Sequence, residues 1–250
     1  MYKRQGLYAQ NGGTATNSGT IKLNSSGTAY GMYGSGGAKL TNNSSINGKA
    51  ENAYGMYGSN MTNAGTISIT GTGTGASYGM RSTGGTVSNT GQIEVTASQA
   101  YGISLTGSGT ATNSGTITVT GTGSDTSYGM YGSGGAKLIN NGTINVNSTS
   151  GTAVGMYATG SDSSITNTGN IVLNGVSITT DYSGISSSDD PDTDATNCTS
   201  AGCGNFIKVE NGATFYNNGQ VSSASAMNFN VMAAANTGTI MLARGGSFEA

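Results

Sequence analysis

Apolar side chains recur along this chain in a fixed pattern around asparagine. In the motif apolar-x-Asn-x-Gly-x-Ile-x-apolar, one apolar residue stands two positions before the asparagine and an aliphatic residue stands four positions after it. The nine asparagines are Asn17, Asn42, Asn63, Asn89, Asn113, Asn140, Asn167, Asn217 and Asn236. Consecutive copies lie 19 to 27 residues apart, except for a gap of 50 between Asn167 and Asn217. A repeat of this length indicates a stack of similar coils.

The alternation inside each motif is typical of a short β-strand. Apolar residues two positions apart share one face of a strand, so Ile117 and Val119 are expected to point inward and the flanking threonines outward. Glycine follows the asparagine by two positions in eight of the nine copies, which fits a corner with positive φ or a close backbone approach. Stacked asparagine side chains can hydrogen-bond from coil to coil. One internal stack should contain Ile21, Ile67, Ile93, Ile117, Ile144 and Ile171.

A second motif of five residues also recurs once per coil. Its six copies are Ala29–Tyr33, Ala53–Tyr57, Ser77–Arg81, Ala100–Ser104, Ser127–Tyr131 and Ala153–Tyr157. The second position is Tyr or Val and the fourth is Met or Ile, so both are expected inside. The fifth position varies among Tyr, Arg and Ser, which predicts that it faces outward together with the Ala or Ser and the Gly of the motif.

These patterns predict an all-β chain that folds as a right-handed parallel β-helix, a β-solenoid of about nine to ten coils. Glycine accounts for 44 of 250 residues and proline for 1, which suits many short strands joined by tight turns. Helical repeats are excluded because the glycines would break each helix. Leucine-rich repeats are excluded because leucine is scarce.

The repeat divides the chain into four segments. Residues 1–5 share nothing with the repeat and are interpreted as a non-native segment, so the lack of a visible signal peptide says nothing about export. Because no closing cap is visible either, the chain is interpreted as a piece of a longer protein. Residues 6–180 are expected to form coils. Residues 181–205 are expected to be an acidic, cysteine-containing loop inserted in one coil, with the coils continuing through residues 206–250.

Together the Asn-Ser-Gly-Thr-Ile-Thr-Val and Tyr-Gly-Met-Tyr segments resemble the passenger domains of autotransporter adhesins of Gram-negative bacteria. The resemblance covers residues 6–250. It implies secretion through the outer membrane, display on the cell surface, and anchoring through a carboxy-terminal β-barrel that this sequence does not contain. It also implies a host or bacterial cell-surface ligand, either glycan or protein. A structural spacer that carries a distal functional domain remains the alternative function.

Composition argues against several other functions. The chain contains no histidine, so neither a Ser-His-Asp triad nor a histidine-ligated zinc site can form. Its net charge of −2 provides no basic field for nucleic acid, and no sequence feature calls for a cofactor. A polysaccharide-acting β-helix enzyme would need clustered carboxylates, yet the acidic residues outside 181–205 do not recur at one coil position. The flanking threonines are too irregular for ice binding. We therefore expect a non-catalytic protein.

The outward tyrosines are the sharpest candidates for ligand binding. They are Tyr33, Tyr57, Tyr131 and Tyr157. Tyrosine is rigid and amphipathic and is favoured in recognition surfaces. The competing interpretation is that these rings stack along the exterior and stiffen the solenoid.

The acidic loop has its own candidate chemistry. Cys198 and Cys203 are the only cysteines, and in an exported protein they are expected to form a disulfide that closes a small ring. Asp190, Asp192 and Asp194 present oxygen ligands at alternate positions, as calcium prefers. They lack the Gly and the closing Glu of an EF-hand, so a solvated acidic loop is the preferred interpretation.

Overall fold

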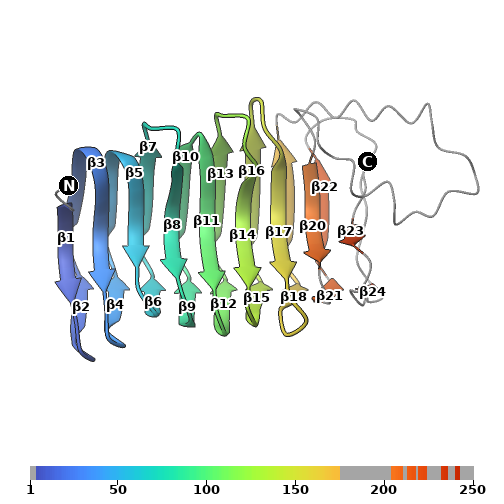
Figure 1. Cartoon of the computed structure of the whole chain (residues 1–250), viewed down its shortest axis with the longest axis horizontal. Coiled ribbons are helices and arrows are strands. Elements are labelled where there is room, and N and C mark those ends of the chain that lie inside the picture. The colour runs from blue at the N-terminus through green and yellow to red at the C-terminus, as the bar shows by residue number, and fades with distance from the viewer. Residues whose placement is uncertain are drawn as a thin grey trace, which may run out of the picture.

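The chain forms a solenoid of parallel strands stacked along one long axis (Figure 1). The structure is a computed structural model, and it describes residues 4–174, 204–210, 213–217, 219–223, 232–235 and 240–242. All the strand pairs in these residues are parallel. None of the described residues forms a helix that could cross a membrane.

One sheet of nine strands contains the asparagine motif, with one strand for each coil. We call it the asparagine sheet, and its strands are β2 (Thr14–Asn17), β4 (Lys39–Asn42), β6 (Asn60–Asn63), β9 (Gly85–Asn89), β12 (Gly109–Asn113), β15 (Ala136–Asn140), β18 (Ser164–Asn167), β21 (Thr214–Asn217) and β24 (Ile240–Leu242). Seven of these strands lie within residues 4–174. The predicted nine to ten coils therefore slightly exceed the part of the solenoid that the structure describes without interruption.

A second sheet of fifteen strands covers the other two faces. The face that carries the isoleucine of the first motif contains β7 (Thr66–Gly71), β10 (Gln92–Ala97), β13 (Thr116–Gly121), β16 (Thr143–Ser148), β19 (Asn170–Asn174) and β22 (Gln220–Ser223). The face that carries the second motif, here called the tyrosine face, contains β1 (Arg4–Ala9), β8 (Ala76–Ser82), β11 (Gln99–Thr106), β14 (Ser127–Ser133), β17 (Ala153–Thr159), β20 (Gly204–Glu210) and β23 (Met232–Ala235). Two long strands, β3 (Thr20–Gly34) and β5 (Ser45–Tyr57), run through both faces.

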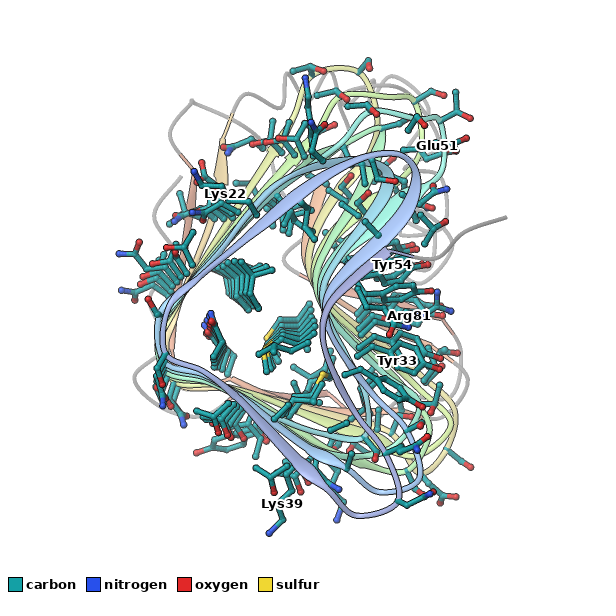
Figure 2. All side chains as sticks on the ribbon, turned by 90° about the vertical axis from the view of Figure 1, so that its left-hand side faces the viewer. Lys22, Tyr33, Lys39, Glu51, Tyr54 and Arg81 are labelled. Atoms are coloured by element: carbon teal, nitrogen blue, oxygen red, sulfur yellow. The ribbon has the colours of Figure 1, made fainter. Side chains whose placement is uncertain are left out.

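The solenoid is right-handed, as the sequence predicts. Figure 2 looks along the axis from the end that carries the N-terminus. Within the first coil the chain passes clockwise from Lys22 through Tyr33 to Lys39, while successive coils recede from the viewer. A clockwise path that moves away from the observer is a right-handed helix, which is the rule for parallel crossover connections.

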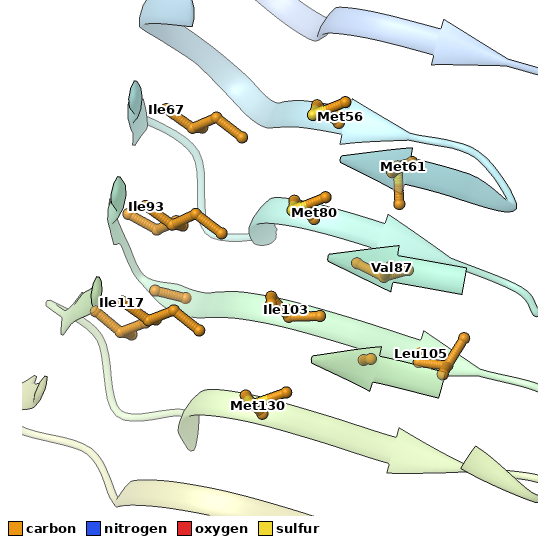
Figure 3. Packing of buried hydrophobic residues seen from close by; sticks show 14 of the residues in the cluster. Met56, Met61, Ile67, Met80, Val87, Ile93, Ile103, Leu105, Ile117 and Met130 are labelled. Atoms are coloured by element: carbon orange, nitrogen blue, oxygen red, sulfur yellow. The ribbon is translucent and has the colours of Figure 1, made fainter. Parts of the chain in front are cut away.

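The interior consists of columns of equivalent side chains from successive coils (Figure 3). The isoleucine stack is confirmed, because the strand register pairs Ile21, Ile46, Ile67, Ile93, Ile117, Ile144 and Ile171 in order. These side chains are fully buried except Ile21, which is partly buried in the first coil. The second-motif methionines, the apolar residues before each asparagine and the aliphatic residues two positions after most of these isoleucines also lie in the interior.

The asparagine side chains also stack in one column, as predicted, and they are buried. Each amide nitrogen from Asn17 to Asn140 donates to the amide oxygen of the next asparagine, over 2.7 to 2.8 Å. Most also donate to the carbonyl of the residue two positions on, as Asn63 does to Gly65 at 3.2 Å. The amides thereby satisfy one another inside an otherwise apolar core.

Close backbone approach explains the glycine that follows each asparagine. None of the described glycines at this position has a positive φ. A Cβ placed on Gly115 would instead collide with the carbonyl oxygen of Gly91 in the preceding coil. The same collision recurs from Gly65 onward, whereas Gly19, in the first coil, has open space around it.

One motif copy and two segment boundaries differ from the sequence interpretation. The prediction that Asn236 continues the asparagine column is wrong, because Ile240 pairs with Phe215 and Leu242 pairs with Asn217. Strand β20 begins at Gly204, two residues before the coils were expected to resume. Strand β1 includes Arg4 and Gln5, which pair with Ala29 and Tyr30. Whether residues 1–5 are native stays a prediction.

Candidate binding surface on the tyrosine face

The tyrosine face carries two columns of tyrosines, and both lie on the outside of the solenoid. The inner column contains the second motif residues Tyr30, Tyr54, Tyr78, Tyr101 and Tyr128. The outer column contains the fifth motif residues Tyr8, Tyr33, Tyr57, Tyr131 and Tyr157. Figure 2 shows Tyr54 and Tyr33 side by side on the same outer flank, away from the core.

The predicted inward direction of the second position was therefore wrong, as was the outward direction of the first and third. The Ala or Ser at the first position is buried, and the Gly at the third faces the isoleucine column. A Cβ on Gly102, for example, would collide with Ile117 and with the carbonyl of Gly129. Because the glycine and the following Met or Ile both face inward, the alternation slips by one residue. The second and fifth positions then emerge on the same outer surface.

Within each column the rings stack at about the spacing of the strands. Neighbours in the inner column have ring centroids 4.7 to 5.1 Å apart and planes within 16 to 21° of parallel. The outer rings stack likewise, as Tyr33 does on Tyr57 at 5.2 Å and 4°. Between columns the rings meet edge to face, at 5.3 to 6.1 Å. Each such pair contributes about 0.5 to 1.5 kcal/mol beyond its burial.

This packing decides which part of each ring is available to a ligand. The ring faces are covered by neighbouring tyrosines, while the hydroxyl-bearing edges point outward. The surface therefore offers rows of phenolic donors and acceptors rather than open aromatic faces. Tyr8 begins the outer column and is 49% exposed, and the sequence analysis did not include it among the candidates. Its copy of the second motif, in β1, begins with Arg4 instead of Ala or Ser, so this copy was not recognised in the sequence.

Arg81 replaces tyrosine in the outer column and is a second residue that the sequence analysis missed. Its guanidinium lies 4.7 Å from the ring centroid of Tyr78, and its Nη1 donates to the hydroxyl of Tyr54 at 3.3 Å. Its buried Nε has no hydrogen-bond partner among the described residues. Among the seven fifth positions between Tyr8 and Tyr157 it is the one charged side chain. An anionic group that binds at the surface of the columns could form an ion pair with Arg81.

Position five in the next coil is Ser104, and it is buried. It is only 2% exposed, while Tyr131 packs edge to face on Tyr101 at 5.8 Å. The surface thus continues across this coil without an aromatic residue at its fifth position. Arg81 and Ser104 mark the place where the outer column changes from aromatic to polar and back.

The structure does not test the other candidate sites. Cys198, Cys203, Asp190, Asp192 and Asp194 all lie outside the described residues. Within the described residues there is no group of three or more His, Cys, Asp or Glu that could hold a metal ion. The tyrosine face is thus the candidate site that the structure brings together.

Burial raises the pKa of three inner-column tyrosines above the ordinary value of 10.0. Burial is the largest cause for Tyr30, Tyr78 and Tyr101, and neighbouring tyrosines add to it. Arg81 opposes the shift at all three. A phenol whose pKa is raised in the folded state keeps its proton while the unfolded chain ionises, so its stabilisation is present below pH 10 and is lost as pH rises further.

We therefore expect the free energy of unfolding to fall as pH rises above about 10. Denaturant titrations on both sides of that pH measure the change, and phenolate absorbance should show late ionisation of these rings. Tyr101→Phe keeps the ring but removes the ionisable group, so this variant should lose less stability at alkaline pH than the unsubstituted protein. Equal losses in the two proteins would contradict the assignment.

A right-handed parallel β-helix with an external aromatic ladder is the class of protein that fold and site define. Residues 57–187, more than half of the chain, match the family model of the BigA third pectate lyase-like domain. The chain belongs to this family. No curated protein and no solved structure shows a significant match to it.

Proposed function

We propose that the chain is a non-catalytic, adhesin-type passenger segment of an autotransporter, displayed on the bacterial cell surface. It attaches to a ligand on a host cell or a neighbouring bacterium through the tyrosine face. The observation that carries the proposal is the double row of tyrosine edges, in which Arg81 and Ser104 interrupt the outer column. Such a surface combines rigid aromatic residues with hydrogen-bonding groups and a cation, as recognition surfaces do.

The family match supports the β-helix architecture of a surface protein of this kind, and the resemblance to passenger domains supplies its location. The segment would reach its ligand from the outer membrane, to which a carboxy-terminal part of the protein would attach it. The ligand is a glycan or a protein. The polar edges of the tyrosines favour a ligand that is itself rich in hydroxyl, amide or acidic groups.

A structural spacer is the second candidate function, and one observation favours it. The ring faces of both columns are covered by one another, so the columns would stiffen a rod even if no ligand were bound. A spacer needs this stacking but not the hydroxyls or the charge of Arg81. Substitutions that keep the rings and remove the polar groups therefore separate the two functions.

The test combines Tyr33→Phe, Tyr57→Phe and Arg81→Gln in one variant. We expect the purified variant to keep its thermal stability to within a few degrees. Its binding to cultured epithelial cells and to a glycan array should weaken roughly tenfold, because charge-assisted and neutral hydrogen bonds are lost together.

Matched controls are Tyr216→Phe and Lys137→Gln, which remove an exposed hydroxyl and an exposed cation elsewhere. They should bind like the unsubstituted protein. If the combined variant also binds normally, or if the unsubstituted fragment binds neither probe, the tyrosine face is not an adhesive surface and the spacer function is favoured.

A further inference from the structure

A shallow recess lies on the isoleucine face, spanning the first three coils and separate from the tyrosine face. Its volume is about 560 Å³. Its polar rim consists of Lys22 and Asn24 from β3, Asn47 and Lys49 from β5, and Ser68 and Thr70 from β7. Figure 2 shows Lys22 on the outer flank of the coil, away from the tyrosines.

The floor of the recess includes a glycine from a column whose other members face the core. The strand register aligns Leu23, Gly48, Ile69, Val95, Val119, Val146 and Leu173 in one column. Gly48 is the one member of the column without a side chain, and its φ of 136° is a conformation that favours glycine. A Cβ there would collide with the backbone of Leu23. The floor of the recess is thus Gly48 and Leu23, between the polar side chains of the rim.

Two cations and two amides face each other across adjacent strands at this point. Lys22 pairs with Asn47, and Asn24 pairs with Lys49. With strands about 4.8 Å apart and a rise of about 3.3 Å per residue, the Cα atoms of the lysines lie roughly 8 Å apart on the diagonal. Both lysine side chains are exposed, and neither side chain forms an ion pair or hydrogen bond with another described residue. The recess therefore presents ammonium and amide donors in alternation.

Carboxylates lie near the recess but not in its lining. Glu94 pairs with Ser68 in the register and accepts a hydrogen bond from its hydroxyl at 3.1 Å, two coils beyond Lys49 and three beyond Lys22 in the C-terminal direction. Glu51 lies two residues after Lys49 but beyond the corner, on the same side of the coil as Tyr54 and away from Lys22 (Figure 2). The lining itself contains two positive charges and no negative charge.

We propose that this recess is a binding site for an anionic polysaccharide, whose carboxylate or sulfate groups are bound by Lys22 and Lys49. The amides of Asn24 and Asn47 donate to the same groups or to sugar hydroxyls. The recess is open and three coils long, which suits a polymer that crosses several strands better than an enclosed small ion. Since both lysines are exposed, each contact is weak and screened by salt, and affinity comes from simultaneous contacts along the polymer.

The test measures binding of the folded protein to immobilised heparin, which is sulfated, to alginate, which is carboxylated, and to neutral dextran. We expect binding to heparin, alginate or both at low ionic strength, a loss at high ionic strength, and no binding to dextran. The double variant Lys22→Gln/Lys49→Gln should bind at least roughly tenfold more weakly. Heparin alone would identify sulfate as the bound group, and alginate alone would identify carboxylate.

The matched control is Lys39→Gln/Lys137→Gln, which removes two exposed lysines of the asparagine sheet and gives the same net charge. It should bind within about twofold of the unsubstituted protein. Equal weakening in both double variants, or no binding to either polyanion, would overturn the proposal. Circular dichroism and thermal unfolding check that both variants are folded.

This inference does not depend on the proposed function of the tyrosine face. Arg81→Gln should leave binding to heparin and alginate unchanged. If Arg81→Gln abolishes it while Lys22→Gln/Lys49→Gln does not, the polyanion binds at the tyrosine face and the recess is not the site. If the protein binds polyanions but does not bind cells, the proposal that the tyrosine face is adhesive is refuted, while the proposal that the recess binds polyanions is not.

Discussion

Replacing Asn140 with alanine is expected to lower the free energy of unfolding by about 4 kcal/mol. Asn140 accepts a hydrogen bond from Asn113 and donates one to Asn167, each at 2.8 Å, and its side chain is fully buried. Alanine would remove both of these short hydrogen bonds from the core and leave a cavity where the amide was. Each buried hydrogen bond contributes roughly 0.5 to 1.5 kcal/mol, and the cavity adds to the loss.

The adjacent residue supplies the control. Asn141 is exposed, and its Oδ1 accepts a hydrogen bond from the hydroxyl of Thr168 at 2.7 Å. Asn141→Ala should therefore cost no more than about 1 kcal/mol. Urea-induced unfolding followed by circular dichroism measures both variants. Similar losses in the two would show that the asparagine column does not stabilise the stack.

Gly115→Ala should also destabilise the solenoid strongly, by about 3 kcal/mol. The added methyl group would meet the carbonyl oxygen of Gly91, which belongs to the backbone of the preceding coil and cannot rotate away. Relief requires the two coils to separate, which weakens the hydrogen bonds between β10 and β13 (Gln92–Ala97 and Thr116–Gly121). Thermal unfolding should show a lower midpoint.

Gly19→Ala tests the same motif position without the collision. No atom lies within 4 Å of a Cβ placed on Gly19, and its φ is not positive. This variant should match the unsubstituted protein or exceed it slightly, because alanine restricts the unfolded chain. If Gly19→Ala were as damaging as Gly115→Ala, a conformational requirement for glycine, rather than the approach of neighbouring coils, would explain the motif.

The columns that alternate with strict periodicity could be predicted from the sequence. Two apolar residues separated by one position define which face of a strand is buried, so the isoleucine stack was found residue by residue. Asparagine could be assigned to a ladder because a buried amide has few other partners than its own copy in the next coil. The repeat of similar coils also predicted the stacked, parallel arrangement of the strands.

The tyrosine face could not be predicted correctly because it departs from alternation. In Tyr78–Arg81 the buried Gly79 and Met80 are consecutive, and no rule of period two places two neighbours on one side. Side-chain chemistry was also a poor guide. Tyrosine resembles a core residue by its apolar ring, yet these rings bury one another on the outside instead. Arg81 was taken as evidence of variability at an exposed position, whereas its register places it over Tyr78.

The ninth motif copy shows a different limit. Around Asn236 the letters match, but strand pairing selects Leu242 as the partner of Asn217. A motif of three fixed residues in a chain rich in Asn, Gly and aliphatic residues also occurs by coincidence. Register across a neighbouring strand, which a single sequence does not contain, decides which copy belongs to the column.

The stacking of coils also determines how this protein would respond to mechanical load. Backbone hydrogen bonds between coils run along the long axis, so a pull on one end of the rod opens them one coil at a time instead of shearing a whole sheet together. A coil of roughly 24 residues releases about 80 Å of chain when it peels off, against the roughly 5 Å that it occupied in the stack. A solenoid under such a load would lengthen in many small steps, and it would dissipate mechanical work before it unfolded completely.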